Sequence, residues 1–215
     1  MKKTILFILV VSTMLSLRTT AQERKSPLSI STDLVSSYVW RGTKFGNGPA
    51  VQPGVEFAAG SFTLGAWGSY CLSDNESPEA DLYTAYNFGK ASLGLTSYYF
   101  PGVSFFKAEN HAFEINGTWT PGIFSLSANW ILNEGAGSKG NDLYFEAGIN
   151  AGAISFFAGT GNGWYTPDGK LNLCNLGISS SKEIKITDTF SFPLTGSVIL
   201  NPASEQLYIA VGISL

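Results

Sequence analysis

The residues that could carry chemistry in this chain are a few ionisable and polar side chains on alternating segments. Five acids, one arginine and four neutral polar residues share the polar parity of their segments: Asp33, Arg41, Glu56, Asp81, Tyr83, Glu114, Asn116, Asn129, Tyr144 and Glu146. A ladder of carboxylates around an aqueous path favours cations and repels anions. The alternative is that these groups pair with one another and fill an interior. Both interpretations require the polar faces to point inward together.

Enzyme chemistry has weak support in the sequence. His111 is the single histidine, so a metal cluster built on histidines is excluded. A serine nucleophile needs a base such as histidine within hydrogen-bond reach. His111 follows Glu109 and Asn110 without a matching signature, which favours a surface or rim histidine. A membrane lipid enzyme would need His111 to find a serine and an acid on the outer face, so we expect no enzyme.

Two loops resemble ligand motifs without completing them. The glycine-rich loop 134–141 has G-x-G-x-x-G spacing, but a strand follows it, whereas a dinucleotide site needs a helix there. In the loop 73–79, Asp74, Glu76 and Glu79 offer oxygen ligands for calcium. Their spacing fits no calcium loop and indicates a solvated loop. We therefore expect no cofactor and no metal.

The two cysteines, Cys71 and Cys174, could form a disulfide in an oxidising compartment. The strand parity puts Cys71 on the inward side and Cys174 on the outward side. We therefore interpret them as two unpaired packing residues. The formal net charge of −3 is too small to indicate a nucleic-acid partner.

The element that must position the first of these groups is the stretch Leu28–Gly42. Its apolar parity ends in Tyr38 and Trp40, and its polar parity carries Asp33 and Arg41. In water such a strand would cover one side of a β-sandwich core. In a membrane its apolar face would meet lipid and its polar face a lumen.

Alternation of this kind recurs in twelve segments. They are Leu28–Gly42, Val51–Ala59, Phe62–Leu72, Ala80–Phe88, Ala91–Phe100, Ala112–Trp119, Ile123–Asn133, Leu143–Ala151, Ala153–Thr160, Leu171–Ser180, Phe190–Leu200 and Gln206–Leu215. Their connections alternate between long and short, with the polar stretch Ser181–Thr189 as the exception. Pro53 predicts a bulge because proline cannot donate to a strand ladder. Sorted connections are typical of a transmembrane antiparallel up-and-down β-barrel.

Aromatic residues support the barrel. Tyr38, Trp40, Tyr70, Tyr99 and Trp130 fall near the long-loop ends of the apolar faces, and Phe57, Phe62, Tyr86, Phe88, Trp119, Phe124 and Phe190 near the short-turn ends. Two girdles of this kind mark the two interfaces of a membrane. A soluble sandwich would use the same aromatics as core, but its surface would carry Lys and Glu where this chain has Ser, Gly, Thr and Asn.

Residues 1–21 predict a secretory signal peptide, with Lys2 and Lys3 before a short apolar run and small residues at the cut. A retained membrane anchor is the alternative, although the run is short for a spanning helix. Residues 22–215 would then form one barrel domain. Charged residues are 13% of the chain, about half the usual share for soluble domains.

Several stretches together resemble the TorF-type, or Gcw, family of conserved exported bacterial proteins that are regarded as porins. They are Asp33–Gly42, the segment PAVQPGVEF around Ala50, Leu64–Ser69, Glu79–Tyr86 and Ser181–Pro202. The resemblance implies an outer-membrane β-barrel with a transport function. It supplies no substrate and no site residues.

The sequence therefore predicts an outer-membrane channel for passive diffusion of small hydrophilic solutes, weakly cation-preferring, in contact with outer-membrane lipid. Arg41, opposed to Asp81 and Glu114, would shape the field at the outer mouth. The alternative is a closed-lumen structural or adhesive barrel that acts through its outer loops. Twelve strands lie between a filled and an open interior, so both interpretations stand.

Overall fold

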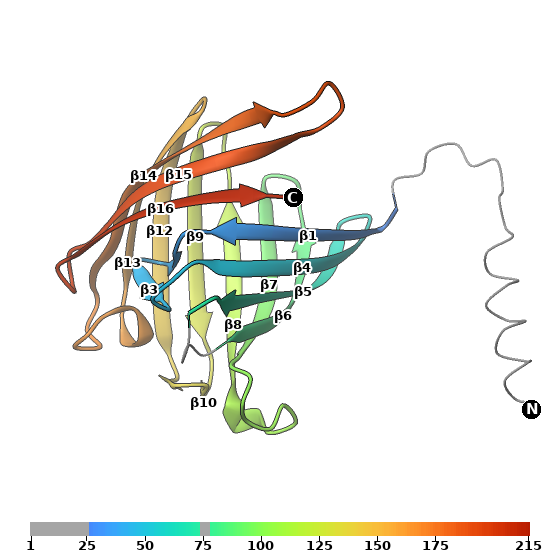
Figure 1. Cartoon of the computed structure of the whole chain (residues 1–215). Helices are drawn as coiled ribbons and strands as arrows, with labels where there is room; N and C mark the ends of the chain where they lie inside the picture. The colour runs from blue at the N-terminus through green and yellow to red at the C-terminus, as the bar shows by residue number, and fades with distance from the viewer. Residues whose placement is uncertain (1–25, 74–77) are drawn as a thin grey trace, which may run out of the picture.

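The computed structural model of the chain describes residues 26–73 and 78–215, which form a closed antiparallel barrel of twelve strands (Figure 1). Neighbours in the chain are neighbours in the barrel, and β1 closes it by pairing with both β4 and β16. The expected signal peptide, together with Asp74 and Glu76, lies outside the described residues. Within the described part, no helix has the length and apolarity to cross a membrane.

The predicted fold class is confirmed. The wall consists of β1 (Leu28–Val35), β4 (Ala50–Ala59), β5 (Phe62–Cys71), β6 (Glu79–Asn87), β7 (Ala91–Tyr99), β8 (His111–Trp119), β9 (Phe124–Ile131), β12 (Asp142–Ala151), β13 (Ile154–Gly161), β14 (Asn172–Lys185), β15 (Ser191–Asn201) and β16 (Gln206–Ser214). Long connections gather at one end, where the link between β7 and β8, drawn in green, extends furthest (Figure 1). Short turns occupy the other end.

Alternating residue type explains the strands and the direction of their side chains. On β8, Ala112 and Glu114 are fully buried, whereas Ile115 is 36% exposed. Among the aromatics predicted to face outward, Tyr70 and Trp130 are exposed near the long-loop end, and Phe57 and Trp119 near the short-turn end. The outward surface is therefore an apolar belt.

The first predicted strand is wrong beyond Val35. Instead of continuing to Gly42, the chain bends at Ser36 and Ser37 and forms a separate hairpin of β2 (Tyr38–Trp40) and β3 (Thr43–Phe45). Tyr38 and Trp40 were predicted to face outward. They pack instead against Trp67, Tyr98 and Tyr165, on the inner side of the wall.

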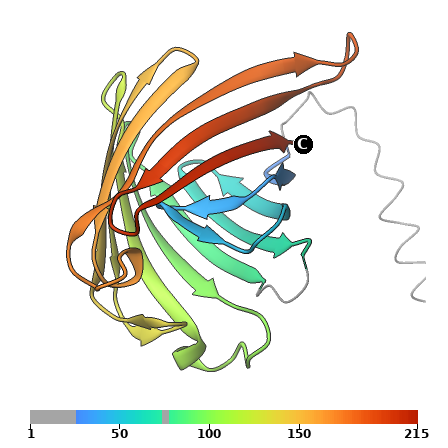
Figure 2. The ribbon, with the colours of Figure 1, turned by 60° about the vertical axis from the view of Figure 1, so that its left-hand side comes forward.

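The closing junction between β1 and β16 is short. Its register contains three residue pairs, Asp33–Ser214, Leu34–Ile213 and Val35–Gly212. Backbone hydrogen bonds between Thr32 and Leu215 extend it by one step. The other wall pairings run over six to ten residue pairs. Figure 2 shows β16, in dark red, beside β1, in blue.

Three further predictions need correction. The segment 181–189 is not a simple loop, since β14 continues to Lys185 and the β14–β15 hairpin extends beyond its neighbours (Figure 2). The glycine-rich loop 134–141 forms a small hairpin of β10 (Glu134–Gly135) and β11 (Ser138–Lys139). The register of β4 with β5 is the same on either side of Pro53, so no bulge forms there.

A register shift does occur between β13 and β14, opposite Cys174. Because a shift by one residue moves side chains to the other face, Cys174 joins the buried inner cluster with Tyr98, Tyr144 and Tyr165. Its predicted outward placement is therefore wrong. Both Cys71 and Cys174 are free thiols, as predicted.

Candidate functional site

The β2–β3 hairpin enters the lumen from the long-loop end. Its two-residue turn, Arg41–Gly42, has φ values of 49° and 81°. Two positive φ angles in succession are typical of the type I′ turn that fits tight hairpins. A Cβ at Gly42 would lie 1.9 Å from the carbonyl oxygen of Cys174, so only glycine allows this approach. The Asn201 side-chain amide also donates to the Gly42 carbonyl at 2.9 Å.

Aromatic side chains seat the hairpin against the wall. The Trp40 ring lies 5.3 Å from the ring of Tyr98 and 5.5 Å from that of Tyr165, measured between centroids. Tyr38 lies 5.5 Å from Trp67 in the same way. Tyr165 belongs to the short helix η2 (Gly163–Tyr165) in the link between β13 and β14. The hairpin therefore contacts the wall and a folded-in loop together.

Arg41 makes the main polar contact of the hairpin. Its guanidinium donates to both oxygens of Glu114, at 2.5 and 3.0 Å. The Glu114 side chain is fully buried and also accepts from the hydroxyls of Tyr98 and Tyr165, each at 2.8 Å. Asn116 donates to the same carboxylate. A buried carboxylate with this many donors is fully satisfied.

The guanidinium of Arg41 also stacks on rings. It lies 4.5 Å from the centroid of Trp40 and 4.6 Å from that of Tyr144. Burial is the largest single influence on the pKa of Arg41 and lowers it, but the hydrogen bond to Glu114 and the electrostatic attraction of Tyr98, Glu114 and Tyr165 together outweigh burial, so the pKa is raised. Burial likewise raises the pKa of the Tyr165 hydroxyl. Arg41 therefore stays charged, and its role here is to hold the hairpin.

Most of the other predicted inward residues also pair within the interior. The Tyr83 hydroxyl donates to Glu56 at 3.0 Å. Glu146 accepts from the Tyr144 hydroxyl and, at 2.8 Å, from the amide of Asn175. Asn116 and Asn129 are joined at 3.1 Å. These groups stabilise the wall, as the filled-interior interpretation requires.

Two of the acids predicted to point inward, Asp33 and Asp81, are not part of these pairs. Asp81 is 7% exposed, and its Oδ1 atom has no hydrogen-bond partner among the described residues. Glu79 lies beside it, buried at the start of β6, so its prediction as a solvated loop residue is wrong. Asp33 takes part in no ion pair within residues 26–73 and 78–215. Among the described residues, neither Asp33 nor Asp81 is therefore paired with a cation as Glu114 is.

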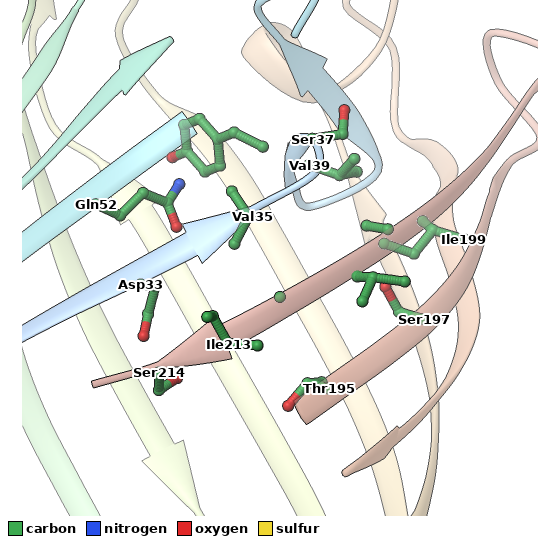
Figure 3. A pocket seen from close by; sticks show the side chains of 14 residues that line it. Asp33, Val35, Ser37, Val39, Gln52, Thr195, Ser197, Ile199, Ile213 and Ser214 are labelled. Carbon is green, nitrogen blue, oxygen red and sulfur yellow. The ribbon is translucent and has the colours of Figure 1, made fainter. Parts of the chain in front are cut away.

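Beside the hairpin the lumen is hollow (Figure 3). A cavity of about 330 Å³ lies between the hairpin and the wall of β1, β15 and β16. Among the described residues, Asp33 is its one charged lining residue, and Thr195, Ser197 and Ser214 supply small polar side chains (Figure 3). Sequence reasoning missed these three, although the polar parity of the last two strands marks them.

The fold and this interior define the class of protein: a closed twelve-stranded β-barrel with an apolar outer belt and a hairpin folded into its lumen. The chain belongs to the family described as "bacterial protein of unknown function (Gcw_chp)", whose model matches residues 21–166. The segment Ser181–Pro202, which also carried the resemblance, lies outside the matched range. No curated protein matches the chain.

Two similar solved structures are engineered forms of the Rhodobacter blastica porin. A mutant with five substitutions is 12% identical, with a TM-score of 0.44, and the match covers 77% of this chain and 55% of the porin. A mutant with three substitutions is 11% identical, with a TM-score of 0.45, and the match covers 89% of this chain and 74% of the porin. This chain thus spans about half the length of the first porin.

Proposed function

We propose that this protein is a porin-like channel of the outer membrane, through which small hydrophilic solutes diffuse passively with a weak preference for cations. The observation that carries the proposal is the cavity beside the hairpin, which Asp33 lines with a carboxylate. A single carboxylate beside a water-filled path attracts cations modestly, because water and salt screen it.

The outward face supports the membrane location. Large apolar side chains cover it along every wall strand, for example Ile30 at 78% exposed and Ile209 at 70%. Soluble monomers rarely leave an apolar surface of this extent in contact with water. Aromatic residues near both ends, such as Trp119 and Trp130, fit the two interfaces of a bilayer. Export would depend on the signal peptide predicted in residues 1–21.

The solute path that we propose runs between the hairpin and the β15–β16 wall. Small residues are among those that line this path, with Ala210 and Gly212 near Ser197. The opposite half of the lumen is occupied by the hairpin and its tyrosine partners. The hairpin thus narrows an interior that would otherwise be wider, and this restricts passage to small solutes.

A second candidate is a closed-lumen structural or adhesive barrel that acts through its outer loops. The buried Arg41–Glu114 pair favours it, because that pair fixes the hairpin across the long-loop end. Under this alternative the cavity would be a closed pocket, and no current would pass.

Conductance in planar bilayers separates the two functions. The purified full chain should give small unitary currents in KCl, with a reversal potential that indicates K⁺ selectivity over Cl⁻. Silence of the folded wild type, together with currents after residues 37–46 are replaced by a short glycine–serine linker, would favour the closed barrel. A clear preference for anions would contradict the proposed channel.

A further inference from the structure

Reactive side chains also meet on the outward face of the barrel. Ser97 on β7 and His111 at the start of β8 lie on this face, where the Nδ1 atom of His111 is 2.8 Å from the Ser97 hydroxyl oxygen. The Nε2 atom of His111 is 2.6 Å from the carbonyl oxygen of Phe105. His111 was predicted to be a surface or rim residue, but it is 6% exposed because Phe105 packs on it.

These two contacts fix the tautomer of the imidazole. A carbonyl oxygen can only accept, so Nε2 must carry the proton and donate to Phe105. The lone pair of Nδ1 then faces Ser97, and the Ser97 hydroxyl donates to it. A hydroxyl within reach of a neutral imidazole, which a third group orients, is the arrangement that activates a serine nucleophile.

Aromatic rings hold the imidazole in this orientation. The Tyr99 ring stacks on His111 with a centroid distance of 5.1 Å and an interplanar angle of 20°. Phe113 stacks at 5.8 Å and 11°. An imidazole that accepts the serine proton becomes a cation, and aromatic faces next to it stabilise that charge. Ring packing therefore positions the base.

An apolar groove of about 300 Å³ on the outward face leads to the same place. Val55, Leu82, Tyr99 and Phe105 are among its lining residues. Leu82 is the register partner of Ser97, and both Tyr99 and Phe105 also contact His111. A hydrocarbon chain lying in the groove would thus bring its head-group end close to Ser97.

We propose that Ser97 and His111 form an acyl-ester site for membrane glycerophospholipids, with the fatty acyl chain in this groove. The exposed side chains Val103, at 55%, and Phe106, at 95%, lie in the adjoining connection and suit the depth at which lipid ester groups occur. The inference rests on the membrane placement proposed above. It does not depend on whether the lumen conducts.

The reaction is an acyl transfer followed by hydrolysis. The Ser97 oxygen bonds to the ester carbonyl carbon while its proton passes to Nδ1 of His111. The bond between that carbon and the glycerol oxygen breaks, and His111 returns the proton to the departing oxygen. Water then attacks the acyl-serine by the same proton route, which releases the fatty acid and restores Ser97.

A fluorophosphonate probe on the folded full chain tests the proposal. It should label one serine, mapped by mass spectrometry to Ser97, and phosphatidylglycerol in mixed micelles should release fatty acid. Ser97→Ala should abolish both, and His111→Gln should slow labelling by about 100-fold or more, the usual contribution of a general base. Ser92→Ala, on the inward face of the same strand beside Thr118, should behave as the wild type.

Three results would overturn the assignment: no labelling of folded wild type, labelling at another serine, or equal labelling rates in His111→Gln and wild type. The mobility of unheated protein in gel electrophoresis reports folding of each variant. If Ser97→Ala fails to fold, Ser97→Cys replaces it, with loss of probe labelling and gain of alkylation by iodoacetamide. Probe labelling of Ser97 without current in planar bilayers would contradict the proposed channel and support the ester site. Current without labelling would contradict the ester site and support the channel.

Discussion

The two sides of the lumen are built in opposite ways from strands of the same kind. On the side of β7, β8 and β12, large side chains and an ion pair meet the hairpin, and this packed side consists of Tyr98, Glu114 and Tyr144 from the wall with Tyr165 from η2. On the side of β15, β16 and β1 the cavity remains open, and this hollow side is lined in part by the small residues Thr195, Ser197, Gly212 and Ser214.

The packed side therefore holds the hairpin in place, whereas the hollow side leaves the space through which we propose that solutes pass. Inward side-chain volume, and not strand geometry, decides where the interior is filled, because both sides have the same alternation of inward and outward residues. The ion pair of Arg41 fastens the hairpin to the packed side, while the strands of the hollow side contribute the hydrogen bond from Asn201 to the Gly42 carbonyl. Substitutions on the packed side should therefore change stability most, and those on the hollow side should change the current.

Glu114→Ala should have the largest effect, because it leaves the buried Arg41 without its carboxylate. Breaking a buried ion pair from one side costs about 3–5 kcal/mol. The free energy of unfolding in urea, measured in detergent or vesicles, should fall by that amount, and the current should rise as the hairpin loosens. Glu109→Ala removes a carboxylate whose ion pair with Lys107 is exposed, and should change little. An unfolding free energy equal to that of wild type would show that the pair does not hold the hairpin.

Gly42→Ala should destabilise the β2–β3 hairpin at its turn. Alanine would meet both the unfavourable positive φ and the carbonyl oxygen of Cys174, a combined cost of about 1–3 kcal/mol. Gly60→Ala is the matched control, because Gly60 has a φ of 61° but nothing within 4 Å of an added Cβ. Urea unfolding measures the difference between the two variants. Equal losses would mean that the approach to Cys174 is unimportant.

Ser197→Trp tests whether the hollow side carries the current. An indole in the cavity should reduce the unitary current several-fold, while the unfolding free energy stays within about 0.5 kcal/mol of wild type. Val198→Trp places the same ring on the next residue, whose side chain is 41% exposed on the outward face. Single-channel recordings of both variants check this. A current unaffected by Ser197→Trp would exclude a path along β15.

Asp33→Asn should have the smallest effect. Loss of this carboxylate from the cavity should reduce the K⁺ to Cl⁻ permeability ratio roughly twofold, because water and salt in the lumen screen a single charge. Reversal potentials in a KCl gradient measure the ratio. Asp168→Asn, in an exposed loop position, should leave it unchanged. A ratio that does not respond to Asp33→Asn would place the selective step elsewhere.

Much of the wall could be predicted because alternation is a strong signal. The predicted Val51–Ala59 differs from β4 by one residue, and Gln206–Leu215 from β16 by one. The hairpin was missed because Tyr38 and Trp40 share the parity of Leu34, so the apolar face was extended across Ser36. What marks it is Ser36 and Ser37 as a break and Arg41–Gly42 as a two-residue turn.

The candidate site was predictable only in part. Arg41 was expected to oppose Asp81 and Glu114 near the outer mouth, and of these two acids it is Glu114 that forms the ion pair. Tyr165 was not found, because it belongs to a short helix in a loop, where no periodicity exists. Cys174 was placed outward because a register shift cannot be predicted from residue type. The contact between His111 and Ser97 was missed because alternation predicts the face of each strand but not which residues of neighbouring strands lie side by side.

The short junction between β1 and β16 has a consequence for how the molecule forms. It pairs residues near opposite ends of the chain, such as Asp33 and Ser214, so its loop-closure entropy is the largest of any wall pairing. Few hydrogen bonds offset this loss of entropy, whereas each hairpin along the wall forms between neighbouring segments of the chain. The barrel should therefore assemble as a growing open sheet and close last at this junction, and amide exchange should open there first.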